Sequence, residues 1–258
     1  HPAGRPDPVS DPRTPSPGRA APSPRLMVPL VGAGLGMAVY LGLRPYGDHS
    51  QDPAVALAAF AQPLWVVAHL AGMAALASVG WVAVRCSELV PGKASRIARW
   101  CGWCGLVGAG LVMPYYGVEA LALHELGRAV SAEDLAPDQA MALVEAVRGN
   151  FVGVSLFAAG LLMLAAAGLL AALAWQRAAH GGLRWAGWPL GGLVALVLPQ
   201  YYLPPAGRVT FGVAFAVAAP LWEELFARGW LYRGWSESSL GPYGAILLSS
   251  LVDRKSVV

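Results

Sequence analysis

Two adjacent carboxylates in an apolar stretch are the residues best suited to chemistry in this chain. Glu223 and Glu224 follow residues 209–222, in which Thr210 is the only polar residue, and Arg228 comes four positions after Glu224. An ionisable side chain inside a membrane span costs on the order of 3 kcal/mol unless it is paired or hydrated, so such residues are candidates for function. Neighbouring helical positions point about 100 degrees apart. The two carboxylates therefore cannot both face lipid.

The position of Arg228 suggests different roles for the two carboxylates. An ion pair between Glu224 and Arg228, four residues apart in the favourable order, would keep Glu224 ionised. Glu223 would then be free to face an interior cavity, where desolvation raises the pKa of a carboxyl group and suits it to act as a general base on water. The alternative is that the span ends at Trp222 and residues 223–228 form a solvated turn at the membrane interface.

The sequence around this pair resembles a known motif. The run Ala219-Pro220-Leu221-Trp222-Glu223-Glu224-Leu225-Phe226-Ala227-Arg228-Gly229-Trp230-Leu231-Tyr232 is similar to the first motif, EExxxR, of the CPBP intramembrane proteases, which include the CAAX prenyl proteases and the bacteriocin-immunity (Abi) proteins. Residues 240–251 are similar to the next helix of that family. One departure is Ala227, where the family most often has Phe; here Phe226 lies one place earlier.

The resemblance implies a membrane-embedded, metal-dependent endopeptidase that hydrolyses a peptide bond near the cytoplasmic face. Glu223 would activate a water molecule, and Glu224 and Arg228 would support it. The implied cofactor is a divalent metal, zinc, held by histidines of two later motifs, FxxxH and HxxxN/D, which this sequence does not contain. The implied partners are membrane lipid and a peptide or lipidated protein substrate. The alternative is a non-enzymatic membrane protein: a scaffold, an immunity factor or a transporter subunit.

Composition predicts the fold class that must position these residues. Hydrophobic residues make up 56% of the chain and charged residues 13%, and several apolar runs reach the ~20 residues that a spanning helix needs. A formal net charge of +3 is too small to suggest a nucleic-acid partner. We expect an all-α, polytopic transmembrane helical bundle of about six spans plus the start of a seventh; the oligomeric state stays open. The predicted spans are residues 26–43, 64–84, 100–123, 151–175, 185–203 and 209–235, with a seventh from 240.

These spans predict a domain organisation. Residues 1–25 are rich in Pro, Ser and Arg and are expected to form a disordered tail. Residues 26–203 form five spans of unrecognised type, and residues 204–252 begin the protease-like core. Residues 253–258 resemble the translation of a common sequencing-adapter end, so we expect the natural sequence to continue differently after about Val252 and the chain to be a fragment.

Charge asymmetry predicts the orientation. Basic residues gather in the tail and in the loops after the second and fourth spans, which places the N-terminus in the cytoplasm. They are Arg5, Arg13, Arg19, Arg25, Arg85, Lys93, Arg96, Arg99, Arg177 and Arg184. We expect the protein to lie in a bacterial plasma membrane. The loop after the third span is acidic, and within it residues 137–147 have apolar side chains at helical spacing. We expect this helix to lie along the outer membrane surface.

Three other features carry weaker alternatives. His69, in the middle of the second span, could be a ligand or proton relay, but a hydrogen bond between helices is more ordinary. Glu119 and His124 are five residues apart, hence not on one helix face, and are predicted to be interfacial. Residues 100–104 resemble a WCGxC redox motif; the competing interpretation is two small buried residues, Cys101 and Cys104, one helical turn apart.

Overall fold

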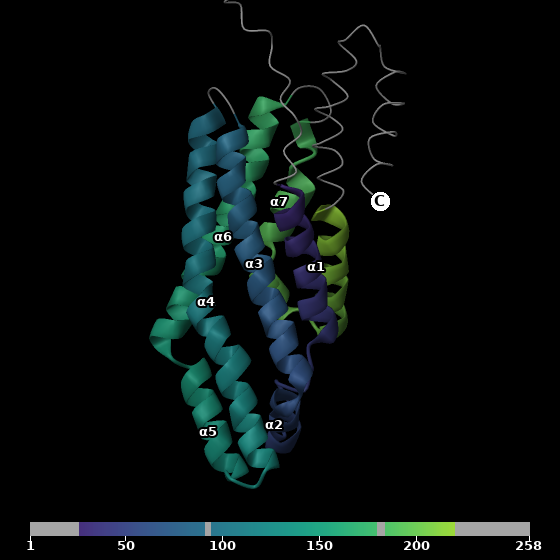
Figure 1. Cartoon of the computed structure of the whole chain (residues 1–258), viewed down its shortest axis with the longest axis vertical. Coiled ribbons are helices and arrows are strands. Elements are labelled where there is room, and N and C mark those ends of the chain that lie inside the picture. The colour runs from purple at the N-terminus through teal and green to yellow at the C-terminus, as the bar shows by residue number, and fades with distance from the viewer. Residues whose placement is uncertain (1–25, 91–93, 180–183, 220–258) are drawn as a thin grey trace, which may run out of the picture.

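The computed structural model describes residues 26–90, 94–179 and 184–219, and every regular element in these ranges is helical (Figure 1). The predicted all-α class is therefore confirmed for this part of the chain. In chain order the helices are α1 (Met27–Leu43), α2 (Pro53–Ala61), α3 (Pro63–Leu89), α4 (Ser95–Ser131), α5 (Pro137–Arg148), α6 (Phe151–Ala178), α7 (Trp188–Ala195), the 3-10 helix η3 (Pro199–Tyr202) and the helix Pro205–Ala219.

Three of these helices are long and apolar enough to cross a membrane: α3, α4 and α6. Their 27, 37 and 28 residues correspond to about 40, 55 and 42 Å of helix, against a hydrocarbon core about 30 Å thick. The chain is thus an integral membrane protein. Helix α1 and the helix Pro205–Ala219 are shorter apolar helices, and the predicted seventh span lies outside the described residues.

Helix α4 runs almost the full length of the molecule and joins its two parts (Figure 1). It packs against α3 and α6, and its second half also packs against α2 and α5. This second half has its own apolar core, which includes Leu57, Phe60, Leu123 and Val144. We call this three-helix part the extension and the rest the main bundle.

Helix α5 confirms the helix predicted for residues 137–147 but not its predicted location on the membrane surface. Its apolar face is buried: Ala140 is 0% and Val144 2% exposed, and both pack in the core of the extension. Figure 1 shows α5 lying alongside the second half of α4. The reason is that α4 continues beyond the length that a bilayer covers, and so it offers a protein surface to the apolar face of α5.

Helix α2 was not predicted, although its start signal is present in the sequence. Asp52 is the N-cap residue, and its side-chain Oδ1 accepts a hydrogen bond from the backbone N–H of Ala54 at 2.9 Å. Pro53 occupies the first helical turn, where its missing N–H costs nothing. These two residues fix the beginning of α2 and thereby place Phe60 in the core of the extension.

The predicted fifth span, residues 185–203, is wrong as a continuous helix. The structure shows α7 ending at Ala195 and a separate 3-10 turn from Pro199 to Tyr202. Pro199 has no N–H with which to continue an α-helical ladder, and its ring clashes with the preceding turn. Gly191 and Gly192 lower helix propensity further. The predicted sixth span begins earlier than expected, at Pro205.

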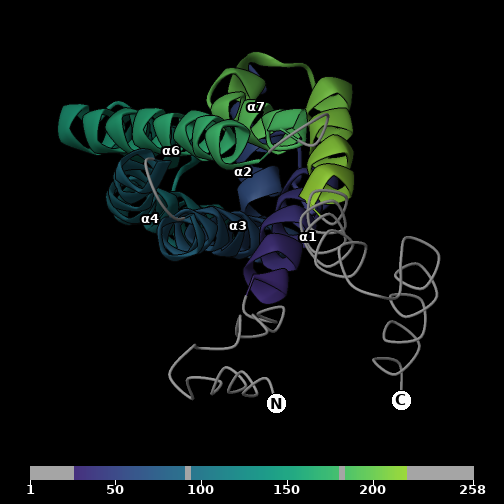
Figure 2. The same cartoon turned by 90° about the horizontal axis from the view of Figure 1, so that it is seen from above.

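The helices of the main bundle lie side by side, as Figure 2 shows from above. Small residues bring them into close contact. A Cβ atom added at Gly108 of α4 would lie 2.8 Å from the carbonyl oxygen of Gly160 on α6. One added at Gly36 of α1 would lie 2.8 Å from the carbonyl oxygen of Ala71 on α3. Close backbone approach through small residues is a usual means of packing helices in a membrane.

Two glycines on α4 provide a matched test of this packing. The Gly108→Ala variant should be less stable by about 1–3 kcal/mol, because the new methyl group meets backbone atoms that cannot move aside. The Gly110→Ala variant should be as stable as the wild type or more stable, because nothing lies within 4 Å of its Cβ position and Ala favours a helix. Thermal unfolding in a mild detergent measures both. Equal stability of the two variants would contradict the proposed close contact.

Candidate functional site

The predicted catalytic residues Glu223, Glu224 and Arg228 lie outside the described residues, so their geometry is not part of the structure. The helix that leads towards them is described over Pro205–Ala219. Phe215 and Ala219 are 0% exposed and belong to the core of the main bundle. A Cβ atom at Gly34 of α1 would lie 3.2 Å from both Ala216 and Ala219. The chain therefore enters the motif from a helix that is packed against α1.

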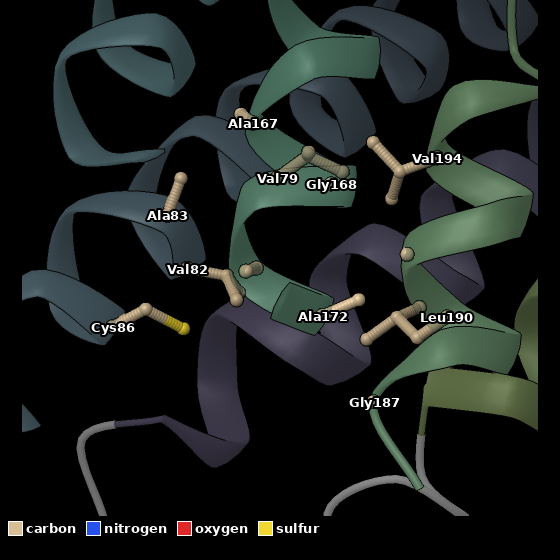
Figure 3. Close-up of a pocket in the computed structure, with 12 residues that line it drawn as sticks. Val79, Val82, Ala83, Cys86, Ala167, Gly168, Ala172, Gly187, Leu190 and Val194 are labelled. Atoms are coloured by element: carbon tan, nitrogen blue, oxygen red, sulfur yellow. The ribbon is translucent and has the colours of Figure 1, made fainter. Parts of the chain in front are cut away.

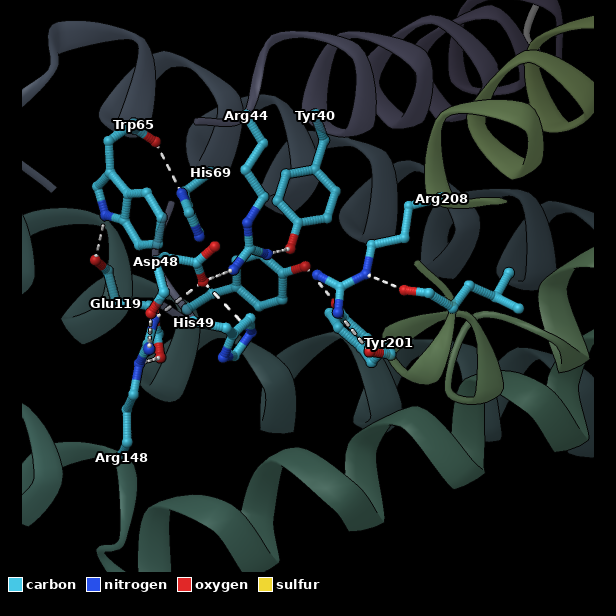
Figure 4. Close-up of polar contacts among 12 residues, drawn as sticks. Tyr40, Arg44, Asp48, His49, Trp65, His69, Glu119, Arg148, Tyr201 and Arg208 are labelled. Carbon is cyan, nitrogen blue, oxygen red and sulfur yellow. Dashed lines mark hydrogen bonds and ion pairs between the residues drawn. The ribbon is translucent and has the colours of Figure 1, made fainter. Parts of the chain in front are cut away.

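The structure instead reveals a buried polar cluster where the main bundle meets the extension (Figure 4). We call it the junction cluster. Its side chains come from α1, the loop after it, α4, α5, η3 and the helix Pro205–Ala219, and five of them are charged. The members are Tyr40, Arg44, Asp48, Tyr116, Glu119, Arg148, Tyr201 and Arg208.

Arg148, the last residue of α5, forms the central ion pairs. Its Nε donates to Glu119 Oε1 at 2.8 Å and its Nη2 to Oε2 at 3.0 Å, so the guanidinium holds the carboxylate with two hydrogen bonds. Its Nη2 is also 3.3 Å from Asp48 Oδ2. The same Asp48 oxygen accepts from Nη2 of Arg44 at 2.5 Å. Arg148 thus connects α5 with α4 and with the loop that follows α1.

Aromatic rings enclose these charges. The guanidinium of Arg44 lies 5.2 Å from the ring centroid of Trp65, and that of Arg148 lies 5.0 Å from the ring of Phe60. Trp65 Nε1 donates to the backbone carbonyl of Glu119 at 2.8 Å. Rings facing a desolvated guanidinium stabilise its charge, so the aromatic residues replace part of the hydration that burial removes.

The electrostatics of the loop follow from these contacts. Burial alone would raise the pKa of the Asp48 carboxyl, but the adjacent Arg44, His49 and Arg148 outweigh it and hold this pKa below its usual 3.8. His49 Nε2 is 3.3 Å from Asp48 Oδ2, yet partial burial and the neighbouring arginines lower the pKa of His49 below its usual 6.5. At neutral pH, Asp48 is therefore ionised and His49 uncharged.

The structure gives His69, His124 and Glu119 partners within the protein. His69 Nδ1 lies 2.7 Å from the carbonyl oxygen of Trp65 in its own helix, α3, and its ring contacts Tyr40 and Tyr116. His124 Nδ1 lies 2.7 Å from the carbonyl oxygen of Phe60, so this residue joins α4 to α2. Glu119, predicted to be interfacial, is 8% exposed and paired with Arg148. These contacts are structural.

The cysteine pair also has a packing role. Cys101 is 0% exposed, and its thiol donates to the carbonyl of Ala167 on α6. Of the two residues that the packing interpretation expects to be buried, Cys101 is buried and Cys104 is partly buried, and both are free thiols. Cys86 faces an apolar pocket between α3, α6 and α7, which Figure 3 shows to be lined by small and branched side chains such as Ala172 and Val194.

No three His, Cys, Asp or Glu residues within the described ranges gather in a way that could hold a metal ion. The acidic members of the junction cluster, Asp48 and Glu119, are both engaged by arginines. The described residues thus do not fit the implied zinc centre. Any such centre needs donors from outside these ranges.

The junction cluster was not predicted from the sequence, although its residues leave local signals there. Tyr40, Arg44 and Asp48 are spaced four residues apart, which places them on one side of a helix and its continuation. Glu119 is an acidic residue in an apolar helix, which calls for a buried partner. The identity of that partner, Arg148, depends on tertiary contacts across 29 residues and on the unexpected packing of α5.

Removing the central cation tests whether the cluster holds the two parts together. The Arg148→Gln variant should lose about 3 kcal/mol of stability, because it leaves the buried Glu119 carboxylate without its cation. The matched Arg128→Gln variant should unfold like the wild type, because its ion pair with Glu125 is exposed on both sides. Denaturant unfolding in detergent measures the difference. Equal stability of the two variants would refute this role for Arg148.

The lowered pKa of Asp48 predicts a pH dependence. Because its folded-state pKa is below 3.8, ionised Asp48 stabilises the fold above pH 3.8, and this contribution is lost as the pH falls further. The stability difference between the wild type and Asp48→Asn should therefore be largest at pH 6 and shrink as the pH is lowered below about 4. Unfolding measured across this range provides the test, with the exposed Asp134→Asn as control. A difference that did not change with pH would count against the ion pairs.

Comparison with known proteins relates the C-terminal segment to one family. The model of the family "Type II CAAX prenyl endopeptidase Rce1-like" matches residues 205–252. No curated protein and no solved structure matches the chain significantly. The matched segment begins at the first residue of the helix Pro205–Ala219 and includes the Glu223–Arg228 motif. Residues 205–252 are thus similar to the Rce1-like family of CAAX prenyl endopeptidases, which confirms the resemblance predicted from that motif.

Proposed function

We propose that this chain is part of a CPBP-type intramembrane endopeptidase. The observation that supports the proposal most directly is the family match over residues 205–252, which contains Glu223, Glu224 and Arg228. The apolar helices of the main bundle are consistent with a site inside a membrane. We infer that the protein lies in a bacterial plasma membrane with its N-terminus in the cytoplasm and cleaves a peptide or lipidated protein near the cytoplasmic face.

In this proposal the two carboxylates have different roles. Glu223 accepts a proton from water, and the water oxygen attacks the carbonyl carbon of the scissile peptide bond. The C–N bond then breaks, and the leaving amine takes up the proton from Glu223. Glu224 stays ionised through its pairing with Arg228, and the two residues support Glu223. The divalent metal that the family implies, zinc, would need ligands from outside the described residues.

Cleavage of a model substrate tests the proposal. Membranes containing the complete gene product are incubated with a quenched fluorescent peptide that ends in a farnesylated CAAX sequence, the substrate class in the family's name. The Glu223→Gln variant should cleave at least about 100-fold more slowly than the wild type, because a general base contributes that much or more. The Glu145→Gln variant changes an exposed carboxylate of α5 and should retain full activity.

Two results would argue against the enzyme. One is cleavage by Glu223→Gln at the wild-type rate, with both proteins present in equal amounts. The other is no cleavage of this peptide, or of a general casein substrate, by the wild-type protein. Either result would favour the alternative of a non-enzymatic scaffold, immunity factor or transporter subunit.

A further inference from the structure

The extension and the main bundle each have an apolar core of their own. The core of the extension is built by α2, α4 and α5, and Trp65 in the first turn of α3 is the member that the main bundle contributes. The core of the main bundle is a separate cluster, to which α1, α3, α4 and α6 contribute. Because the two cores consist of different residues, each part can stay packed while the angle between the two parts changes.

Among the described helices, α4 alone continues from the main bundle into the extension (Figure 1). The other connections between the two parts are not helical: residues 44–52 follow α1, Gln62 separates α2 from α3, and residues 149–150 separate α5 from α6. Gln62 and Asn150 have extended backbone conformations, and residues at the ends of helices can absorb changes in φ and ψ. A change in the angle between the parts therefore requires only that α4 bend.

The sequence of α4 favours bending at the place where the helix passes between the two parts. Pro114 lies inside the helix, and it has no N–H to donate to the carbonyl of Gly110 one turn earlier. Gly110 and Gly117 flank this proline, and nothing lies within 4 Å of a Cβ atom added at either position. At the other glycines of α4 such an atom would lie 3.3 Å or less from a neighbour: Gly102, Gly105, Gly108 and Gly127. Packing thus does not account for Gly110 and Gly117, and both lower the helix propensity beside the proline.

Asp48 links the two parts beside this segment of α4. Its Oδ2 accepts a hydrogen bond at 2.5 Å from Arg44, which follows the end of α1 in the main bundle, and lies 3.3 Å from Nη2 of Arg148 on the extension. Nη1 of Arg148 also donates to the backbone carbonyl of Asp48 at 3.1 Å. The guanidinium of Arg148 is held in turn by Glu119, which lies beyond the proline on α4. One carboxylate thus connects the end of α1 to the extension.

Two buried polar atoms of this link have unmade hydrogen bonds. Both arginines use the same oxygen of Asp48, and the other oxygen, Oδ1, accepts no hydrogen bond from any group in the described part of the chain. The Nε of Arg44 is likewise buried without a partner there. Buried polar groups with unmade hydrogen bonds destabilise the state that contains them. A movement that exposes these atoms to solvent therefore offsets part of the cost of breaking the ion pairs.

We propose that the extension pivots on the main bundle by bending of α4 within residues 110–117, the hinge segment, and that Asp48 holds it in the position that the structure shows. Beyond Pro114, α4 continues to Ser131 over about 25 Å, so a bend of about 20° would move the tip of the extension by about 9 Å. Tyr116 lies in the hinge segment and is hydrogen-bonded to Tyr201 of η3. The movement is thereby coupled to the turn that precedes the helix Pro205–Ala219. This inference does not rest on protease activity.

Distances between spin labels on the two parts test the proposal. One pair, Asp134→Cys with Tyr202→Cys, places labels at exposed positions near the tip of the extension and on η3 of the main bundle. The control pair, Arg177→Cys with Tyr202→Cys, lies within the main bundle. Both pairs are made in the full chain with its three native cysteines replaced by alanine, and they are measured in a mild detergent by double electron–electron resonance. With Asp48 intact, the first pair should give one main distance.

Three substitutions assign the movement to the hinge segment and to Asp48. The Asp48→Asn variant should add a second distance, several ångströms from the first, in the pair across the hinge segment and leave the control pair unchanged. Adding Pro114→Ala, which restores the missing N–H, should reduce this second population at least about twofold. The Asp138→Asn variant removes an exposed carboxylate of α5 and should give the wild-type distances. Circular dichroism checks that the variants have equal helix content.

The proposal is overturned if folded Asp48→Asn keeps the single wild-type distance, if both label pairs broaden together, or if Pro114→Ala leaves the second population unchanged. If Asp48→Asn loses helix content, Arg148→Lys takes its place. Its ammonium group keeps a cation beside Glu119 but cannot bind two carboxylates as the guanidinium does, so it should release Asp48 and give the same second distance. A single wild-type distance in this variant would equally overturn the proposal.

Discussion

The pairing of Arg148 with Glu119 and Asp48 is the interaction on which the arrangement of the two parts depends. Arg148 ends α5, and Asn150, two residues later, caps α6 by accepting a hydrogen bond from the N–H of Gly153 at 2.9 Å. The same short segment therefore fixes the end of the extension and the start of a long membrane helix. Without the contact between Arg148 and Glu119, the end of α5 and the start of α6 would no longer be fixed relative to α4.

Burial strengthens the electrostatic attraction in this interaction and also imposes a desolvation penalty. In a low-dielectric interior the attraction between Arg148 and Glu119 is strong, but removing both from water is expensive. The aromatic ring of Phe60 and the bidentate geometry offset part of that cost. The gain from such a cluster is a defined register between helices: an apolar contact between α4 and α5 would tolerate sliding along the helix axis, whereas the paired oxygens of Glu119 do not.

The fold could be predicted from the sequence wherever it depends on long apolar runs. The second, third and fourth predicted spans correspond to α3, α4 and α6, because length and hydropathy decide such helices locally. Hydropathy could not reveal that the predicted fifth span is broken at Pro199, since membrane helices often tolerate proline. It also could not show that α5 packs on protein, because an amphipathic helix has the same pattern whether its apolar face meets lipid or another helix.

The two sites also differ in how far they could be predicted from the sequence. The Glu223–Arg228 motif is contiguous, so its resemblance to a family could be recognised in the sequence, and the family match over residues 205–252 confirms that resemblance. The junction cluster joins Asp48 to Arg148 across 100 residues, and no local pattern contains both. Its polar residues appear singly in the sequence, where each is compatible with an exposed loop or a helix end. The packing of α5 against α4 brings Arg148 to Glu119 and Asp48.

The first five predicted spans lie outside the matched segment, and this arrangement indicates a role for them. The helix Pro205–Ala219 is held near its start by the contacts of Arg208 with η3 and its flank. Along its length it packs against α1, where Gly212 lies close to Leu41 and Gly34 close to Ala216. Helix α1 is in turn fixed by α3 through Gly36 and by the junction cluster through Arg44. The position at which the chain enters the Rce1-like motif is therefore set by helices outside the matched segment. A protein of this kind can change the surroundings of its motif through α1 or the cluster without changing any residue of the motif itself.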